Sequence, residues 1–238
     1  MHRRLGVLLL AGIAMAALPL AAAALGLDVE AKGGVGFALG STDNSDVTGI
    51  PRVAGQGGIS ADLYLLTAGP VDLGIAAGAE YAYLTTHSTW KNYGSLGSDQ
   101  TTDGRYNYLI FPISLVARYP LSQSVQLTAH LGGFIGYFVS GKYDLSWDPQ
   151  NPGFGLTNST DNKFNSDTTN KTEYGIHATA GADVAIMPNV SVSPAVQLDM
   201  GLTDNTPNTA APPAGTNGDF KDTIWSLTFM VGIKYKAL

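Results

Sequence analysis

The sequence predicts an all-β protein: an eight-stranded antiparallel up-and-down transmembrane β-barrel, preceded by a signal peptide. Three observations predict it. Eight segments alternate apolar and polar residues with a period of two, which is strand geometry because successive side chains point to opposite faces. The connections between these segments are alternately long and short. Charged residues make up only 13% of the 238 residues, about half the share usual in soluble domains, as expected for a surface that faces lipid.

The chain begins with a segment typical of secretory signal peptides. Arg3 and Arg4 form a basic start, residues 5–18 form an apolar core, and the alanines at 21–24 suit a signal peptidase. A transmembrane anchor is the alternative, but the apolar run is shorter than the ~20 residues that span a bilayer. We therefore expect a signal peptide at 1–24, a single barrel domain at 25–238, and export to the bacterial outer membrane.

The first four barrel segments place apolar side chains on one face and polar side chains on the other. In the first of them Val29 and Phe37 share a face, while Glu30 and Lys32 share the opposite face. Apolar residues facing lipid and polar residues facing inward are the signature of a transmembrane barrel. In order, the alternation predicts strands at 27–39, 57–67, 71–85 and 105–119.

The last four segments keep the same phase, most regularly at the end of the chain. There Trp225 and Phe229 share a face, and Thr228 and Lys234 share the other. After the first 24 residues no segment holds 18 consecutive apolar residues, which excludes a helical membrane protein. In order, the alternation predicts strands at 125–143, 172–186, 190–202 and 223–238.

The connections indicate how the barrel is oriented. Three are tight turns containing Gly, Pro, Asn or Ser, and four are long and rich in polar residues. Bacterial barrels have short periplasmic turns and long extracellular loops, so both termini are predicted to be periplasmic. The short connections are 67–70, 120–124 and 187–189, and the long ones are 40–56, 86–104, 144–171 and 203–222.

Composition excludes several other classes of protein. A soluble barrel that buries its apolar face is the alternative fold, but it would need outer faces rich in Lys and Glu, which these strands lack. Without Arg3 and Arg4, 11 basic residues remain against 19 acidic ones, a net charge of −8, so no basic face for nucleic acid is expected. The absence of Cys excludes disulfides, thiolate chemistry and a lipid anchor on cysteine.

Three local sequences resemble a known family. They are the strand at 107–115 with its Tyr-Leu pair and Pro112, the glycine-rich run at 132–137, and residues 180–183 before the Pro188-Asn189 turn. Together they resemble the outer-membrane β-barrel domain family, small eight-stranded barrels similar to the transmembrane domain of OmpA, OmpX and OmpW. The resemblance implies a monomer in contact with outer-membrane lipid, including lipopolysaccharide, and with the barrel-insertion machinery.

Inward positions predict a polar network inside the barrel. Eight strands enclose only enough room for side chains, and charges removed from water there must pair. A narrow polar conduit is the alternative interpretation. The predicted network comprises Glu30, Lys32, Asp62, Glu80, Arg118, His130, Lys142, Glu173, His177, Asp183, Asp199 and Lys234.

The functional prediction is a structural or surface-interaction role through long extracellular loops, with an unknown extracellular ligand. One alternative is a narrow channel or port for small or apolar solutes, similar to OmpW. Another is a lipid A-modifying enzyme, but adjacent His87 and Ser88 point to opposite faces of a strand. We therefore expect no catalytic residues, cofactor or metal. Loop aromatics are the candidate contacts with a partner: Trp90, Tyr93, Trp147, Phe154 and Phe164.

Overall fold

The computed structural model describes residues 26–42, 47–91, 99–148, 158–163, 171–203 and 222–238. The predicted signal peptide at 1–24 lies outside these residues. In the described part of the chain, no helix is long and apolar enough to cross a membrane. The strands are β1 (Gly26–Thr42), β2 (Val47–Ala68), β3 (Val71–Trp90), β4 (Asp99–Pro120), β5 (Val125–Asp148), β6 (Ser159–Lys163), β7 (Thr172–Met187), β8 (Val190–Gly201) and β9 (Asp222–Lys236).

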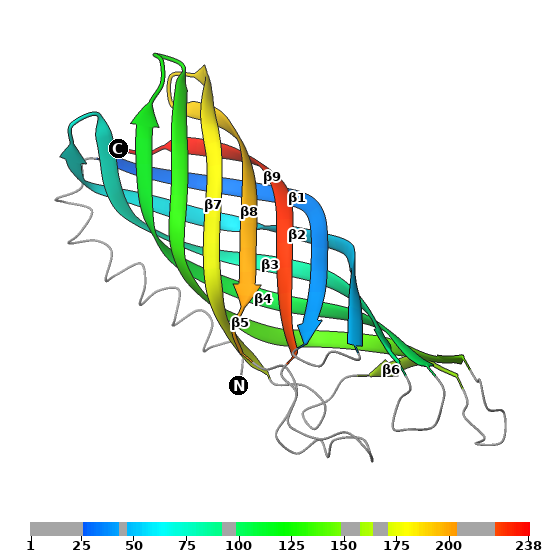
Figure 1. Cartoon of the computed structure of the whole chain (residues 1–238). Helices are drawn as coiled ribbons and strands as arrows, with labels where there is room; N and C mark the ends of the chain where they lie inside the picture. Colours follow the sequence, from blue (N-terminus) through cyan, green and yellow to red (C-terminus); the bar gives the residue numbers. More distant parts are fainter. Residues whose placement is uncertain (1–25, 43–46, 92–98, 149–157, 164–170, 204–221) are drawn as a thin grey trace, which may run out of the picture.

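Eight of these strands form a closed antiparallel ring, which confirms the predicted fold class (Figure 1). Each strand pairs with its neighbours in the order β1-β2-β3-β4-β5-β7-β8-β9, and β9 pairs back onto β1. The short strand β6 is additional and pairs with β5. The tight turns and the C-terminus lie at one end, called the turn end, and the opposite end is called the loop end.

Four strands run further toward the loop end than the alternation predicted. The added residues of β3, β4 and β5 are mostly polar, and those of β2 mix Val47, Ile50 and Val53 with polar residues and glycine, so the period of hydrophobicity disappears although the backbone pairing continues. Parts of the predicted long connections are therefore strand. A signal was present in the β-branched threonines at 86, 89, 101 and 102. Strand β2 begins at 47 and not 57, β3 ends at 90 and not 85, β4 begins at 99 and not 105, and β5 ends at 148 and not 143.

These added residues carry the sheet beyond the closed ring. Strand β7 begins at Thr172, opposite Tyr137 of β5, so the rest of β5 pairs with β4 and β6 instead. The pairing of β2 with β1 likewise ends at Arg52, opposite Ala38. Figure 1 shows this part of the sheet projecting from the loop end with β6 at its margin. It comprises residues 47–52, 85–90, 99–105, 140–148 and 159–163, and we call it the extension.

The outer face of the ring is apolar, as predicted. Leu131 and Ile113 are 64% and 65% exposed, and aromatic residues such as Tyr81 and Tyr235 stand near the two ends of this band. A water-soluble barrel would not present such a face, because large continuous apolar surfaces drive association. Other outward apolar residues are Val35, Phe37, Ile59, Leu109, Leu115, Ile135, Tyr174, Ile186, Phe229, Val231 and Ile233.

One irregularity changes the phase of β5. Tyr108 pairs with Phe138 but Asn107 pairs with Ser140, so Val139 is an extra residue, a β-bulge. An extra residue moves every later side chain to the opposite face. Ser140 and Lys142, expected to point inward, therefore point outward opposite Asn107 and Arg105.

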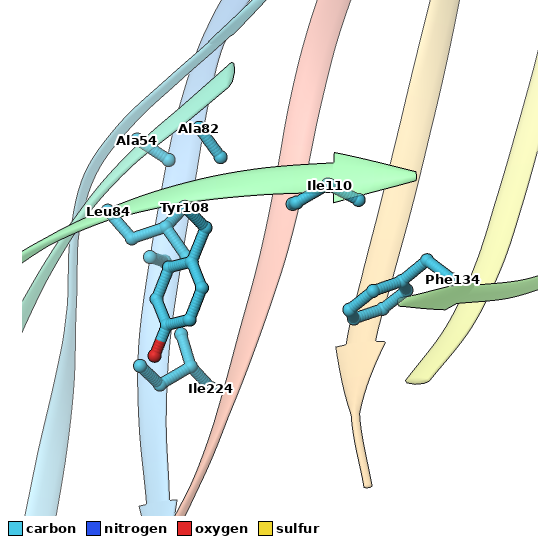
Figure 2. Close-up of a cluster of buried hydrophobic side chains, with 8 residues drawn as sticks. Ala54, Ala82, Leu84, Tyr108, Ile110, Phe134 and Ile224 are labelled. Atoms are coloured by element: carbon cyan, nitrogen blue, oxygen red, sulfur yellow. The ribbon is translucent and has the colours of Figure 1, made fainter. Parts of the chain in front are cut away.

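Toward the loop end the interior is occupied by apolar side chains. Figure 2 shows that they converge from strands around the ring: Tyr108 and Ile110 from β4, Phe134 from β5 and Ile224 from β9. The Tyr108 ring packs edge-on against Phe138, with 5.7 Å between ring centroids. We call this cluster the apolar cap. Its buried members are Ala38, Ala54, Ala82, Leu84, Tyr108, Ile110, Phe134 and Ile224.

Candidate functional site: the barrel interior and the extension

The interior near the turn end is organised around one arginine. Arg118 of β4 donates from Nη1 to Asp28 Oδ2 at 3.0 Å and from Nη2 to Asp72 Oδ2 at 2.9 Å. Its guanidinium also stacks on the buried Tyr64 ring, 3.9 Å from the centroid. Three strands, β1, β3 and β4, are thus joined through one planar donor, which suits arginine better than lysine.

A buried lysine organises the next layer toward the loop end. Lys234 of β9 is 1% exposed, and its Nζ lies 3.2 Å from Asp62 Oδ2 and 3.1 Å from Asp183 Oδ2. Each carboxylate has a second partner: His130 Nε2 lies 3.2 Å from Asp62, and Ser193 donates to Asp183 at 2.7 Å. The lysine charge is therefore compensated from opposite parts of the ring, as a charge withdrawn from water requires.

Two glutamines connect the layer below the apolar cap. Lys32 Nζ lies 2.7 Å from Glu80 Oε1 and donates to Gln197 Oε1 at 2.9 Å. Gln56 and Gln197 both donate to Glu80 Oε2, at 2.7 and 2.8 Å. The same two amides also donate to Asp199 Oδ2, at 3.1 and 2.9 Å. These contacts join strands that are far apart around the ring, so the layer spans the barrel from wall to wall.

The same layer contains a hydroxyl, an imidazole and a carboxylate in line. His177 Nδ1 lies 2.7 Å from Asp199 Oδ1, and its Nε2 lies 3.2 Å from Thr179 Oγ1. All three residues are buried. The adjacent cavity, which His130 also lines, has a volume of about 20 Å³. That volume admits one water molecule, so a lipid or solute substrate has no room beside the imidazole.

The structure places most of the predicted network residues in these layers. Glu30 is buried over Gly232 of β9, and Glu173 is buried beside Gly136 and Gly201 at the level of the apolar cap. Lys142 was placed wrongly: the bulge at Val139 turns it to the outside. The members found in the interior are Glu30, Lys32, Asp62, Glu80, Arg118, His130, Glu173, His177, Asp183, Asp199 and Lys234.

Several interior partners were not among the predicted residues. Asp28 and Asp72 already lay on predicted inward faces, so alternation held the signal for both. Gln56 was missed because the predicted strand began at 57, after the glycine-rich start of β2. Gln197 also lay on an inward face, but the predicted network was selected by charge, and a neutral amide does not meet that criterion.

The extension carries a second, exposed group of ionisable residues. His87 Nδ1 lies 2.7 Å from Asp103 Oδ1 and 3.0 Å from Arg52 Nη2. Ser88, the hydroxyl next to this histidine, lies on the opposite face and pairs with Thr102. The sequence expectation that His87 and Ser88 cannot meet therefore agrees with the register. Among the described residues, no group of three or more His, Asp or Glu side chains has the arrangement of a metal site.

Two further ion pairs lie on the outward face of the extension. Arg105 pairs with Asp144, and Lys142 Nζ lies 3.1 Å from Asp161 Oδ1. The backbone N–H of Asp161 also donates to Asp144 Oδ1 at 2.7 Å. This backbone donor, followed by the charge of Arg105, holds the pKa of Asp144 below its ordinary value. The short strand β6 is thus fixed to β5 by side chains as well as by its ladder.

Of the five aromatic residues predicted as partner contacts in loops, two lie in strands and three lie outside the described residues. Trp90 and Trp147 are not in loops: they lie at the ends of β3 and β5, where both are paired through Gln100 of β4. Both are partly buried. Tyr93, Phe154 and Phe164 lie outside the described residues.

The ring of eight antiparallel strands, its apolar outer face and its ion-paired interior together define a transmembrane β-barrel of the outer-membrane class. The sequence agrees with this class. Residues 20–206 match the model of the outer membrane protein beta-barrel domain, and the chain belongs to this family. The protein is therefore located in the bacterial outer membrane.

Solved structures with similar folds are distant in sequence. A major outer membrane protein from Thermus thermophilus is 16% identical with a TM-score of 0.44, covering 88% of this chain and 99% of its own. Neisserial surface protein A is 14% identical with a TM-score of 0.39, covering 89% and 97%. The attachment invasion locus protein Ail of Yersinia pestis is 12% identical with a TM-score of 0.38, covering 88% and 99%. No curated protein sequence matches the chain significantly.

Proposed function

We propose that this protein is a closed, non-conducting outer-membrane barrel with a structural or surface-interaction role at its loop end. The observation that carries the proposal is the filled interior. Three ionic layers, centred on Arg118, Lys234 and the Gln56–Gln197 pair, are followed by the apolar cap. A conduit would need continuous water-accessible space, whereas these side chains bond to one another across the ring.

The position of the tight turns supports an extracellular loop end. The turns at 69–70, 121–124 and 188–189 lie at the same end of the barrel as Gly26 and Lys236. Bacterial barrels direct such turns toward the periplasm. On this orientation the extension stands outside the cell. The partners would be outer-membrane lipid, including lipopolysaccharide, the insertion machinery during assembly, and an extracellular ligand of unknown identity.

Conductance across a planar bilayer tests the closed interior. The full chain should give no discrete current steps under conditions in which a general porin gives them. A reproducible single-channel conductance would replace the proposal with the alternative of a narrow channel or port. Insertion of the folded chain must be verified with the same lipid. Resistance to trypsin digestion and the different mobility of boiled and unboiled samples provide this check.

The geometry gives little support to a lipid-modifying enzyme. The Thr179–His177–Asp199 arrangement is enclosed, and His87 of the extension has its neighbouring hydroxyl on the other face. We propose that these histidines are structural. Mass spectra of lipid A from cells with and without the protein should be identical. A change in acylation or phosphorylation that His177→Gln abolishes would contradict this.

Epitope accessibility tests the surface role. A tag inserted at Asn158, beside β6, should bind antibody on intact cells, whereas a tag at Asn189 in the β7–β8 turn should require permeabilised cells. Both positions are exposed, so both insertions should be tolerated. The reverse pattern would mean that the barrel is inverted, and the surface-interaction role would be wrong.

A further inference from the structure

Three basic residues stand side by side on the outward face of the extension. Arg105 of β4 is directly opposite Lys142 of β5, which is directly opposite Lys163 of β6. Like charges that face each other across strands destabilise a sheet. We call Arg105, Lys142 and Lys163 the basic row. Its repulsion is tolerated in the sheet, which points to negative charge that compensates it.

Part of that compensation comes from an acidic row one step further from the barrel. Asp103 is opposite Asp144, and Asp161 donates its backbone N–H to Asp144. The ion pairs run diagonally between the rows, from Arg105 to Asp144 and from Lys142 to Asp161. Among the described residues, Lys163 is not within ion-pair distance of a carboxylate. On the described strands, the outward row next to the basic row on its barrel side contains no acid.

The level of the basic row is set by the rows beneath it. The next outward row toward the membrane is Tyr83, Asn107 and Ser140, and below it lie Tyr81, Leu109 and Tyr137. Outward tyrosines mark the boundary between hydrocarbon and headgroups. Two residues along a strand span about 7 Å, and a strand tilted by about 40° rises about 5 Å over that length, so the basic row lies roughly 5 to 10 Å beyond the tyrosines along the membrane normal. The headgroup region, which extends about 5 to 8 Å beyond the hydrocarbon on each side, overlaps that depth.

The bulge at Val139 is what completes this row. Without the extra residue Lys142 would point to the inner face, and Arg105 would face a neutral position on β5. The bulge thus changes the face of the strand at the point where the barrel leaves the apolar band. Conversion from apolar to basic follows within a few residues on the adjacent strands β4 and β5, and β6 adds Lys163 beside them.

We propose that the basic row binds the phosphate groups of an anionic glycolipid in the outer leaflet. The proposal rests on the orientation given under Proposed function. Arg105 and Lys142 have side chains that are 41% and 48% exposed, and exposed ion pairs are weak enough to share their donors with an incoming phosphate. The acidic row lies on the side away from the membrane, so a headgroup that approaches from below meets the basic row first.

Native mass spectrometry of the full chain folded in detergent can measure this binding. The probes are diphosphoryl lipid A and the same lipid after removal of both phosphates. The variant Lys142→Gln with Lys163→Gln removes two charges from the row. Lys91→Gln with Lys236→Gln is the control, because it removes two lysines outside the row, the second at the turn end, and changes the net charge equally. The difference in mobility between boiled and unboiled samples verifies folding of each.

The wild-type chain should prefer the diphosphoryl lipid, and the row variant should lose that preference. A base near an anionic lipid surface is worth about fivefold in affinity, so the double variant should bind about twenty-fivefold more weakly. Unchanged binding by the row variant, or equal loss in the control, would overturn the proposal. Displacement of the lipid by an equal concentration of pyrophosphate would also overturn it, since the row would then be a general anion site. Lipid binding measured in detergent does not depend on the orientation of the barrel in the cell. A failure of this proposal can therefore be distinguished from a failure of the orientation, which the epitope tags test.

Discussion

Two lysines of this barrel make ion pairs of the same length in opposite surroundings. Lys234 Nζ lies 3.1 Å from Asp183 in the interior, and Lys142 Nζ lies 3.1 Å from Asp161 on the extension. The first pair has side chains that are 1% exposed, whereas the second has exposures of 48% and 63%. Distance alone therefore does not tell what a pair does. The buried pair joins strands across the interior of the ring, whereas the exposed pair lies in contact with solvent on the outward face of the extension.

The largest expected difference comes from removing these two lysines. Lys234→Met leaves Asp62 and Asp183 buried without their cation, which should lower the free energy of unfolding by about 3–5 kcal/mol. Lys142→Met removes an exposed pair and should cost at most about 1 kcal/mol. Urea unfolding in lipid vesicles, followed by tryptophan fluorescence, measures both. Equal costs would show that the interior network is as hydrated as the extension.

Outward positions on one strand sharpen the contrast between ring and extension. Leu131 and Ser146 are both exposed and outward on β5, the first in the apolar band and the second beyond it. Arginine at Leu131 should cost about 2–4 kcal/mol, the range for a cation near the bilayer midplane. Arginine at Ser146 should change stability by less than about 0.5 kcal/mol. The same vesicle assay applies, and a costly Ser146→Arg would place the membrane boundary further out than the tyrosines.

Glycines on the two faces of the wall give a smaller contrast. A Cβ at Gly36, on the inner face of β1, would meet the carbonyl oxygen of Leu227 on β9, whereas a Cβ at Gly55, on β2, would meet nothing within 4 Å. Gly36→Ala should therefore destabilise by about 1–3 kcal/mol through crowding of backbone. Gly55→Ala should be neutral or slightly stabilising, because alanine loses less backbone entropy. If both are neutral in the unfolding assay, the β1–β9 contact is looser than described.

The smallest expected effect is the titration of Asp144. Its pKa lies below the ordinary 3.8 because of the Asp161 N–H and the Arg105 charge. A pKa lowered by folding stabilises the folded extension above pH ~4, and this contribution is lost only as the pH falls through the lowered value. Carbon-detected NMR should find the midpoint below 3.8, and Arg105→Gln should raise it. A midpoint at or above 3.8 would mean that β6 does not dock on β5 in solution.

The sequence predicted the ring because lipid enforces alternation on each strand that crosses it. Residues such as Val29 and Glu30 can be assigned to faces without knowing their neighbours. The bulge at Val139 could not be predicted, since it follows from pairing between Asn107 and Ser140 on two strands. Beyond the membrane the alternation ends, so the sequence pattern predicts loops for most of the extension and for β6. Which interior residues pair, as Lys234 does with Asp183, depends on the curvature of the whole ring.

The uneven height of the wall makes the molecule anisotropic in the plane of the membrane. Strand β5 runs on to Asp148, about 35 Å past its last partner on β7, while β8 ends at Gly201 opposite Gly175. A neighbour diffusing toward β7 and β8 meets an apolar wall whose described strands stop near the rim. One approaching β4 and β5 meets a wall that continues outward as a polar sheet. Neighbouring proteins in the membrane should therefore contact one side of the barrel more often than the other, even for a barrel that acts as a monomer.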